Sequence, residues 1–488
     1  MSFDRRRLLQ IGATTALGAG LAPLAACGRP EPRRPAKADY TIRIADAKIE
    51  LAPGVEVTTT AYNGQVPGPL LRFQQGRPVT VDIVNDTARP EQLHWHGQKV
   101  PVDVDGSAEE GTPFIPAHGS RRIGFTPGPA GLRFYHTHVI AGGDLTAGQY
   151  SGQVGPVYVE PRQEPGRYDR EVFLTLKEFE PSLSQGGDMA MDFLAGEEDP
   201  ALKAKGEAAM KDSLARGMPR GYEVGYKHFA INGRMLGHGE PIRVKAAERV
   251  LLHVLNGSAG ETRSLALPGH VFQVAAVDGN PLPRPVEVPV LWLGTAERIS
   301  AIVEMNRPGV WVLGDTSDDD RGNGMGIVVE YAGATGQPQW RAPPRAKWDY
   351  SVFGETGGLA RPPDEVFDMV IAKDNAALKG FNRWTINGVA FDDAQMAPMF
   401  RLKQDGRYRI RMANASDDIH PVHLHRHSFE LTHVHGKATA GVLKDVVMLG
   451  GYQKLEIDFT ADNPGRTLFH CHQQLHMDFG FMCLFDYA

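Results

Sequence analysis

Cysteine is scarce in this chain of 488 residues. There are three cysteines, at positions 27, 471 and 483, against 18 histidines. So few cysteines exclude a fold held together by a framework of disulfides. Many histidines beside few cysteines instead point to metal binding.

Blocks of like charge and long apolar runs are also missing from most of the chain. Lys and Arg number 52 and Asp and Glu 58, for a net charge of -6, and no basic block stands out. We therefore expect no nucleic-acid partner. Beyond the N-terminus, no segment is apolar over enough residues to span a bilayer. Helical periodicity is weak except around Pro200 to Ala215.

The N-terminus predicts export. Arg5, Arg6 and Arg7 precede an apolar run of small residues, which is typical of a twin-arginine signal in residues 1–26. The run ends Leu-Ala-Ala-Cys27, which resembles a bacterial lipobox with lipidation at Cys27. Cleavage by an ordinary signal peptidase and an uncleaved anchor are the alternatives, and the short, Gly- and Ala-rich run disfavours the anchor. We expect a periplasmic or cell-envelope protein, tethered to the membrane through Cys27 and residues 27–39.

Glycine and proline are plentiful, at 55 and 35, and they bound short alternating runs typical of β-strands. An Asn-Gly turn recurs at Asn63, Asn232 and Asn387. Each turn is followed by a strand that ends in another Asn: Asn85, Asn256 and Asn414. This repeat predicts an all-β chain of three similar domains, at residues 40–161, 168–333 and 362–488, with a linker at 334–361.

The repeat shows where histidines gather. Nine and eleven residues after the strand-ending Asn stand His94 and His96 in the first domain, and His423 and His425 in the third. Five and seven residues after a later Gly stand His136 and His138, and His470 and His472. The middle domain has no histidine at any of these offsets.

In a strand, His-x-His places both imidazoles on the same face. Two such pairs in one domain can meet two pairs from another around one metal cluster. Neutral imidazoles are good ligands for copper. Any single His-x-His could be a packed or surface pair, but four pairs at matched offsets favour a metal site.

The third domain carries a further set. His420, Cys471 and His476 supply the two imidazoles and one thiolate of a blue copper site. Because Cys471 lies between His470 and His472, electrons could pass from this site to the cluster through a few covalent bonds. A buried structural cysteine is the alternative reading of Cys471.

These motifs resemble those of the three-domain multicopper oxidases, which include laccases, bilirubin oxidases and bacterial cuprous oxidases. The matching segments are His94-Trp-His-Gly97, His136-Thr-His138, His420-Pro-Val-His-Leu-His425 and His470-Cys-His-x3-His476. The resemblance implies three cupredoxin-like Greek-key β-barrel domains and four copper ions, with the three-copper cluster between the first and third domains. It also implies a copper-dependent oxidoreductase that passes electrons to dioxygen.

The resemblance carries ligand roles onto individual residues. It assigns the type 1 copper to His420, Cys471 and His476, and the type 2 copper to His94 and His423. It assigns one type 3 copper to His96, His136 and His472, and the other to His138, His425 and His470. His427 matches a position that binds no copper.

Two positions depart from the family pattern. The axial position of the type 1 site is Phe481, followed by Met482. Phe cannot bind copper, so we expect a three-coordinate site with a raised potential, unless a bulge brings Met482 in. The acidic position after His476 holds Met477, with Asp478 one residue later. Asp105 matches the family Asp near the type 2 copper and is our candidate proton donor, although it could be a plain Asp-Gly turn residue.

Other residues favour no site. We interpret Cys483 as a buried small hydrophobe, and His433 and His435 as one face of a strand. An insert at 186–226 contains Met189, Met191, Met210 and Met218. It could gather Cu(I), but a helix over the substrate entrance with Met as core filler is the favoured interpretation.

The leading functional hypothesis is laccase-like oxidation of phenols or aromatic amines coupled to reduction of dioxygen to water. Oxidation of a metal ion, Cu(I) or Fe(II), is the alternative. A non-enzymatic scaffold, a copper store and a two-domain nitrite reductase fit less well. The complete ligand set argues against the scaffold, the few Met against the store, and three repeats against the reductase.

Overall fold

A computed structural model describes residues 37–162, 167–184, 192–218, 220–356, 362–392 and 394–487. The predicted signal and Cys27 lie outside these residues, so the export prediction stays untested. No helix among the described residues is long and apolar enough to cross a membrane. Residues 38–488 form one compact unit.

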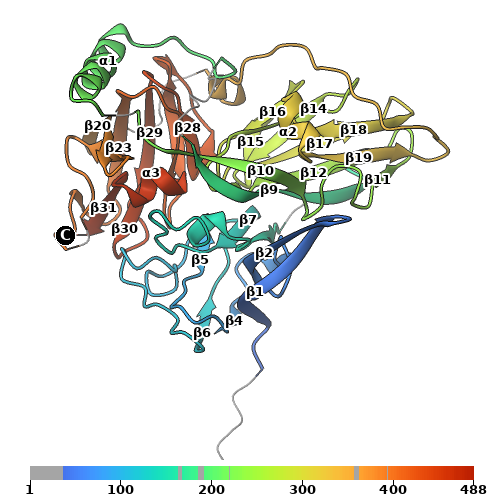
Figure 1. The fold of residues 1–488 in the computed structure, drawn as a ribbon, viewed down its shortest axis with the longest axis horizontal. Coiled ribbons are helices and arrows are strands. Elements are labelled where there is room, and N and C mark those ends of the chain that lie inside the picture. The colour runs from blue at the N-terminus through green and yellow to red at the C-terminus, as the bar shows by residue number, and fades with distance from the viewer. Residues whose placement is uncertain are drawn as a thin grey trace, which may run out of the picture. The chain divides into compact units, whose positions relative to one another are not determined.

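The first third of this unit is a sandwich of two sheets (Figure 1). One sheet has the strand order β2-β1-β4-β6: Val55–Tyr62, Tyr40–Ala52, Val79–Asn85 and Ser120–Phe125. The other has the order β3-β8-β7-β5: Leu71–Gln74, Val154–Glu160, Gly131–His136 and His94–His96. Buried side chains of both sheets, such as Val81 and Trp95, share one core, so the sheets pack face to face.

The middle third repeats this plan with more strands. Its large sheet runs β10-β9-β12-β17-β14-β15: Glu223–Ile231, Arg170–Ser184, Arg249–Asn256, Arg298–Glu304, Phe272–Val277 and Asn280–Val288. Opposite it lie β11-β19-β18 and β13-β16: Ile242–Val244, Gly326–Tyr331, Val310–Gly314, Arg263–Leu265 and Leu291–Leu293. A short helix α2, Asp318–Gly322, precedes β19.

The last third is the third sandwich. Its first sheet runs β21-β20-β23-β29-β25-β26, with β27 beside β25: Phe381–Ile386, Glu365–Leu378, Arg407–Asn414, Lys454–Thr460, Phe429–Val434, Lys437–Ala438 and Leu443–Lys444. Its second runs β22-β31-β30-β24-β28: Met399–Leu402, Met482–Tyr487, Thr467–Cys471, His420–Leu424 and Val446–Leu449. Helix α3, Gln474–Asp478, follows β30.

The Asn residues of the sequence repeat make equivalent hydrogen bonds in the three domains. Asn63, Asn232 and Asn387 all adopt positive φ before a Gly that does the same, as a tight hairpin turn requires. Each uses its side chain to bind the first strand of its domain, at Arg43, Thr175 and Val370. The three strand-ending Asn side chains are all fully buried and donate to loop carbonyls. In each domain the first strand also pairs in parallel with the strand that ends in Asn. This is the expected all-β fold in three related units.

Helix α1, Pro200–Ala215, has the bounds that the sequence predicts. Asp199 caps it by accepting from the N–H groups of Ala201 and Leu202, and Pro200 occupies the first turn. The helix lies against β20, where the Ser213 hydroxyl donates to the Asn375 carbonyl. Ser213 is its only buried residue and Met210 is half-buried, so the expectation that Met fills a core here is wrong. Met189 and Met191 lie outside the described residues.

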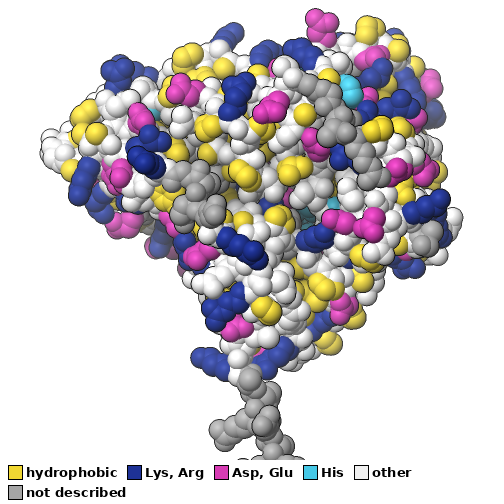
Figure 2. Space-filling view, turned by 180° about the vertical axis from the view of Figure 1, so that it is seen from behind, with side chains coloured by type: hydrophobic (Ala, Val, Ile, Leu, Met, Phe, Trp, Pro, Cys, Tyr) yellow, Lys and Arg dark blue, Asp and Glu magenta, His cyan; other side chains and the backbone are white. Residues whose placement is uncertain are grey.

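The segment predicted as a linker, 334–361, is mostly exposed before Trp348 and packed from Trp348 to Phe353. Trp348, Tyr350 and Phe353 are buried in the core that the second and third sandwiches share, the last two within the short helix η2, Tyr350–Phe353. On the face shown in Figure 2, acidic and basic side chains are interspersed and few histidines reach the surface.

The three sandwiches meet at a buried network of six charged side chains. Three are cations and three are anions, so their formal charges balance: Arg133, Arg298, Lys444, Asp278, Glu297 and Asp445. Arg298 binds both oxygens of Asp445, at 2.7 and 2.6 Å. Arg133 reaches the same carboxylate at 3.2 Å, and Lys444 bridges Asp278 and Glu297 at 2.9 and 3.0 Å. Every domain contributes to this network, so it fixes how the domains join.

We expect Arg298→Gln to lower the free energy of unfolding of the copper-free protein by about 3–5 kcal/mol, because it leaves Asp445 buried without its main counterion and removes the second cation beside Asp278. Denaturant unfolding followed by tryptophan fluorescence measures this. Arg411→Gln, which breaks an exposed pair with Asp368, is the matched control and should leave the midpoint unchanged. Equal midpoints for the two variants would contradict a structural role for the network.

Candidate metal centre

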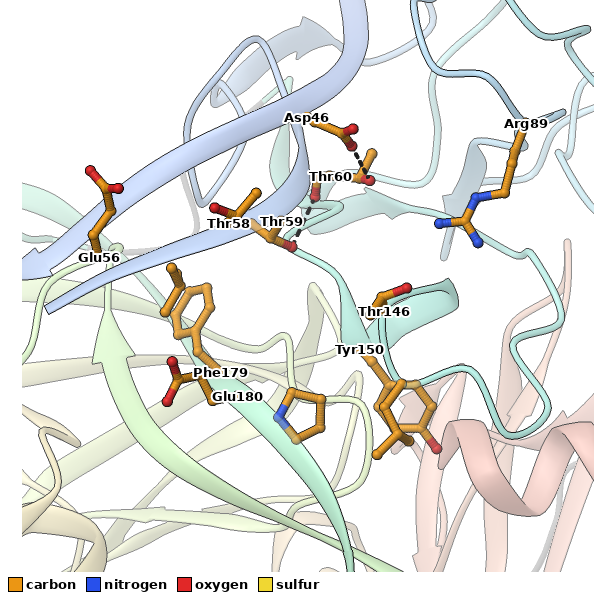
Figure 3. Close-up of a pocket in the computed structure, with 13 residues that line it drawn as sticks. Asp46, Glu56, Thr58, Thr59, Thr60, Arg89, Thr146, Tyr150, Phe179 and Glu180 are labelled. Atoms are coloured by element: carbon orange, nitrogen blue, oxygen red, sulfur yellow. Dashed lines mark hydrogen bonds between the residues drawn. The ribbon is translucent and has the colours of Figure 1, made fainter.

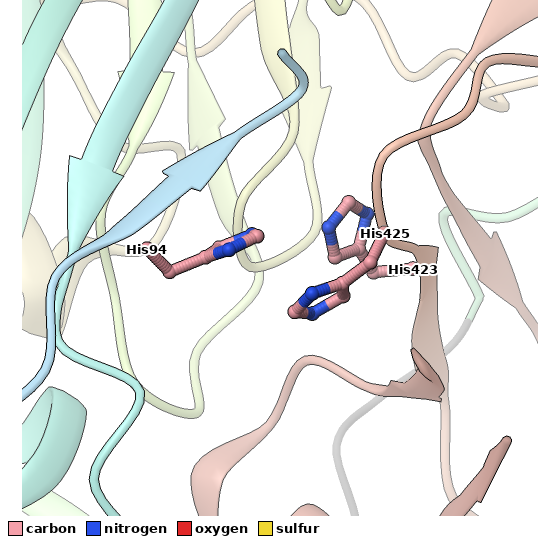
Figure 4. Close-up of side chains that lie close together, drawn as sticks. All are labelled: His94, His423 and His425. Atoms are coloured by element: carbon pink, nitrogen blue, oxygen red, sulfur yellow. The ribbon is translucent and has the colours of Figure 1, made fainter. Parts of the chain in front are cut away.

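The eight histidines of the four His-x-His pairs converge where the first and third sandwiches meet. His94 on β5 lies opposite His136 on β7, and His423 on β24 lies opposite His470 on β30. Figure 4 shows the His94 ring facing His423 and His425 from the other domain. The His94 and His425 ring centroids are 4.0 Å apart, and those of His96 and His423 are 3.7 Å apart. All eight side chains are buried.

The ring distances match the ligand sets carried over from the family. His96, His136 and His472 lie 5.0–5.5 Å from one another between ring centroids. His138, His425 and His470 lie 4.9–5.2 Å apart, and a ligand atom from each falls within 4.8 Å of the others. His94 and His423, the predicted type 2 pair, are 5.8 Å apart. The assignment of each ligand to one ion stays a prediction.

Hydrogen bonds leave one nitrogen of most of these rings free for a metal. Nδ1 is held by a backbone carbonyl in His94, His136, His423 and His470. In the first three the buried Nε2 has no partner among the described residues. His96 is reversed, because its Nε2 lies 3.1 Å from Asp445 Oδ1 and its Nδ1 has no described partner. Fixing one nitrogen in this way orients the other toward a metal.

Most of these imidazoles are neutral, the form in which histidine binds a metal. Burial, together with the neighbouring rings, holds the pKa of six of them well below the ordinary range: His96, His136, His423, His425, His470 and His472. His138 differs. Burial lowers its pKa, but the Glu109 carboxylate at 3.4 Å outweighs burial and raises the pKa above its usual value.

The predicted blue copper ligands form a compact triangle. Cys471 Sγ lies 3.6 Å from Nδ1 of both His420 and His476, and the two nitrogens are 3.1 Å apart. A point equidistant from the three atoms lies about 2 Å from each, which is the length of a bond from metal to imidazole nitrogen. Burial lowers the pKa of His476 to about 3, so this ligand is neutral as well.

The axial side of this triangle is closed by Phe481. Its ring lies 4.9 Å from the His420 ring and is fully buried. Met482 is paired with His470 across β30 and β31 and packs in a separate cluster with Leu468 and Met477. The bulge that would bring Met482 to the site is therefore absent from this part of the chain.

The two sites are joined through Cys471. His470 and His472 flank it in the chain, and His470 Nδ1 also lies 2.8 Å from the Cys471 carbonyl oxygen. A covalent path and a hydrogen-bonded path thus connect the triangle to the cluster.

Asp105 is part of the cluster and not a surface turn residue. Its Oδ2 lies 2.9 Å from His425 Nδ1 and 3.1 Å from His94 Nδ1, and its side chain is fully buried. Gly106 makes this approach possible, because a Cβ there would lie 1.9 Å from the Leu93 carbonyl oxygen. Burial raises the pKa of Asp105, but the charge and hydrogen bond of His94 outweigh it, so the pKa lies below the usual value.

Two further carboxylates at the cluster were not expected from the sequence. Glu110 accepts from the Leu468 N–H at 2.7 Å and lies 3.6 Å from His425. Burial, and then the charge of Asp105, raises its pKa well above the usual value. Burial raises the pKa of Glu109, but His138 and Ser107 lower it to about 2. In the sequence, the only indication of their role was that they follow Asp105 within five residues.

Asp478 sits where α3 meets the first domain. Its Oδ2 accepts from the N–H groups of Ala141 and Gly142 at 2.9 and 2.7 Å, and burial raises its pKa to about 7. Met477 is fully buried and apolar in its surroundings. Asp478 therefore lies one residue after the position at which the family has its acidic residue, and its carboxylate binds the loop after His138.

The remaining predicted residues fall outside the centre. His427 bonds to the His425 carbonyl and to the Tyr487 hydroxyl. His433 lies 3.1 Å from Glu456, whereas His435 packs on Gly196, so the two rings share no site. Cys483 is a free, fully buried thiol, as expected.

Comparisons with known proteins agree with this centre. The chain matches the multicopper oxidase family over residues 43–164, 203–333 and 362–488. The multicopper oxidase MmcO of Mycobacterium tuberculosis is 28% identical, over 100% of this chain and 98% of that one. Bilirubin oxidase of Albifimbria verrucaria is 25% identical, over 87% and 72% of the two chains.

Solved structures share the fold. The structure of Fet3p, described as a multicopper oxidase that functions in iron import, matches with a TM-score of 0.73 at 17% identity, over 92% of this chain and 90% of that one. Laccase from Botrytis aclada matches with a TM-score of 0.72 at 19% identity, over 91% and 87%. Buried imidazoles with free nitrogens, and a thiol between two of them, fit copper. Because three segments match the family, the chain belongs to the multicopper oxidases and is a copper-dependent oxidase that uses dioxygen.

Proposed function

We propose that the donor of this oxidase is a phenol or an aromatic amine, as in laccases. The observation that carries the proposal is an aromatic surface beside the type 1 ligands. Trp384 packs on His476 and His420, with ring centroids 4.3 and 4.7 Å away, and is itself fully buried, so the accessible part of this surface lies beyond it. Next to it, Phe381 and Phe479 stack at 4.4 Å and 11°, and both are half-buried. A planar donor ring can stack on such a surface.

The charges near this surface support a neutral donor over a metal ion. Asp417 and Asp418 are the carboxylates on the loop before His420, and Lys373 Nζ lies 2.6 and 2.7 Å from them. A cation would compete with this lysine for both carboxylates. The metal-ion alternative, Cu(I) or Fe(II), is therefore the second candidate, and the same assay tests it.

The protein groups have distinct parts in the reaction. We propose that His420, Cys471 and His476 hold the type 1 copper and that the eight other histidines hold the cluster. Copper, when bound, takes single electrons from the donor and supplies four to dioxygen. Cys471 connects the two sites, with His470 and His472 as the receiving ligands. Asp105 holds His425 and His94 in place and keeps a carboxylate within proton-transfer distance of both rings.

Phe381→Ala should raise KM for a phenolic donor about threefold to tenfold, because one stacking partner of the donor is lost. KM for Fe(II) or Cu(I) should not change. Oxygen uptake with each donor measures both. Phe114→Ala, which removes an exposed phenylalanine elsewhere, is the matched control and should alter neither value. Unchanged phenol kinetics in the Phe381 variant, or a metal ion as the faster donor, would contradict the proposal.

Phe481→Met should lower the reduction potential of the type 1 copper, because a thioether could then bind where a phenyl ring closes the axial side. Redox titration of the intense blue absorption gives the potential. Phe481→Leu, which offers no ligand atom, should leave it near the wild-type value. A shift of equal size in both variants would trace the effect to packing and not to axial ligation.

We also propose that the chain is exported by a twin-arginine signal and lipidated at Cys27 in the cell envelope. Fractionation of cells should find the protein with the membrane, and Cys27→Ser should release it into the soluble envelope fraction. Cytoplasmic wild-type protein that keeps residues 1–26 would disprove export.

A further inference from the structure

Reduction of one dioxygen to two waters consumes four electrons and four protons, and the cluster that performs it is buried. Its eight imidazoles expose 2% or less of their surface. The residue after the last ligand, Met477, is apolar and fully buried, so it carries no protons. Asp105, which lies beside the cluster, is fully buried too, so protons need a route from solvent.

Two cavities lie on either side of the short helix η1, Gly148–Tyr150. The outer one is a cleft of about 580 Å³ between the β1–β2 hairpin, this helix and β9 (Figure 3). Thr59, Tyr150 and Glu180 are among its lining residues. The inner one, about 10 Å³, has room for about one water molecule. It is lined by the cluster ligands His136 and His472.

Consecutive residues of η1 face the two cavities, because Tyr150 lines the outer one and Gln149 the inner one. The Tyr150 hydroxyl and the Gln149 side-chain nitrogen are both buried without a hydrogen-bond partner among the described residues. Ser258, across the inner cavity from the middle domain, has an equally unpartnered hydroxyl. Buried polar atoms of this kind are normally satisfied by internal water.

Glu178 on β9 connects these groups. One carboxylate oxygen accepts from the Ala259 N–H at 2.5 Å, next to Ser258, and lies 3.3 Å from Lys177 Nζ. Lys177 in turn donates to the Gln149 carbonyl at 2.8 Å. The second oxygen of Glu178 is buried and has no partner among the described residues. Its side chain is fully buried, so this oxygen is not reached by bulk solvent.

The hydroxyls of two tyrosines lie within the electrostatic reach of Glu178. Burial raises the pKa of Tyr226 well above its usual value, and the Glu178 charge raises it further. Burial also raises the pKa of Tyr150 well above its usual value, and the charges of Asp478, Glu223 and Glu178 raise it further. Phe179 and Glu180, which follow Glu178 on β9, line the outer cleft. The inner cavity is lined by Gln149, whose carbonyl accepts from Lys177, and by Ser258, which precedes Ala259. Glu178 thus lies between the two cavities, in the middle domain.

We propose that Tyr150 and Glu178, with a water that Gln149 and Ser258 hold in the inner cavity, form a relay that carries protons from the outer cleft to the His136 and His472 side of the cluster. Each turnover takes four protons along it, while four donor electrons arrive through Cys471, and two waters are formed. The relay rests on the oxidase activity and is independent of the identity of the donor. A purely structural Glu178 would serve only to balance the charge of Lys177.

The test is reoxidation of the reduced protein. In Glu178→Gln, anaerobic donor should bleach the blue absorption at the wild-type rate, because the type 1 site is untouched. After mixing with dioxygen, the return of the absorption should be at least tenfold slower, with a larger solvent deuterium isotope effect. Glu171→Gln, on the same strand but paired with Arg72 at 2.7 Å, is the matched control and should behave as wild type.

Wild-type reoxidation and isotope effect in a folded, copper-loaded Glu178→Gln protein would overturn the relay. If that variant does not fold, Tyr150→Phe decides, because it removes only one unpartnered hydroxyl. It should slow reoxidation severalfold, and an unchanged rate would overturn the relay. A crystal structure of the copper-free protein should show ordered water against Gln149 and Ser258, and a dry cavity would count against it. Wild-type protein that takes up no oxygen would contradict the oxidase activity itself.

Discussion

The carboxylate of Asp445 is the contact on which the arrangement of the cluster depends. Its side chain holds His96 from the first domain, and its backbone carbonyl holds His423 from its own domain at 2.7 Å. Arg298 from the middle domain grips both carboxylate oxygens, while Asp278 accepts from the N–H groups of Asp445 and Val446. A domain without a copper ligand thus fixes two ligands of the site. Because a buried carboxylate without its cation is costly, the three domains can join in only one way at low energy.

Hydrogen bonds of this kind also hold copper ligands in place in the absence of copper. Burial lowers the pKa of six of the eight imidazoles, so these six are neutral and bringing them together costs little electrostatic energy. The greater difficulty is to keep each ring from turning its free nitrogen to another acceptor. In most of the rings a carbonyl or carboxylate binds one nitrogen, as Asp105 does for His425, and leaves the other free. The ring orientations are therefore set by the protein, and metal binding need not pay again for ordering them.

Features that depend on interactions between residues close in the sequence can be predicted from it, whereas features that depend on residues far apart in the sequence cannot. The repeat, the His-x-His pairs and the bounds of helix α1 depend on local spacing, turn residues and a capping Asp199, all visible along a short stretch of chain. The partners of those histidines depend on tertiary contacts. Asp445 lies 349 positions from His96, and nothing in the sequence around Arg298 marks it as the side chain that binds this carboxylate. Glu109 and Glu110 lie near Asp105 in the chain, yet only the fold shows that they reach His138 and His425. The choice between Phe481 and Met482 also required the strand register, because adjacent residues of a strand face opposite sides.

The geometry also separates the two halves of the reaction. In the proposed reaction electrons enter beside Trp384 and Phe381 on β21, where the surroundings are aromatic and the nearby carboxylates share an ion pair with Lys373. Dioxygen is reduced on the far side of Cys471, among carboxylates and polar groups from all three domains. Only the segment around Cys471 belongs to both environments. If the donor binds there as we propose, a change of donor requires changes in β21 and the loops around it. The hydrogen-bond partners of the histidines, such as Asp105 and Asp445, then stay the same. Members of this fold can then differ in donor while they keep one cluster, because the part of the chain that recognises the donor does not hold the ligands that reduce dioxygen.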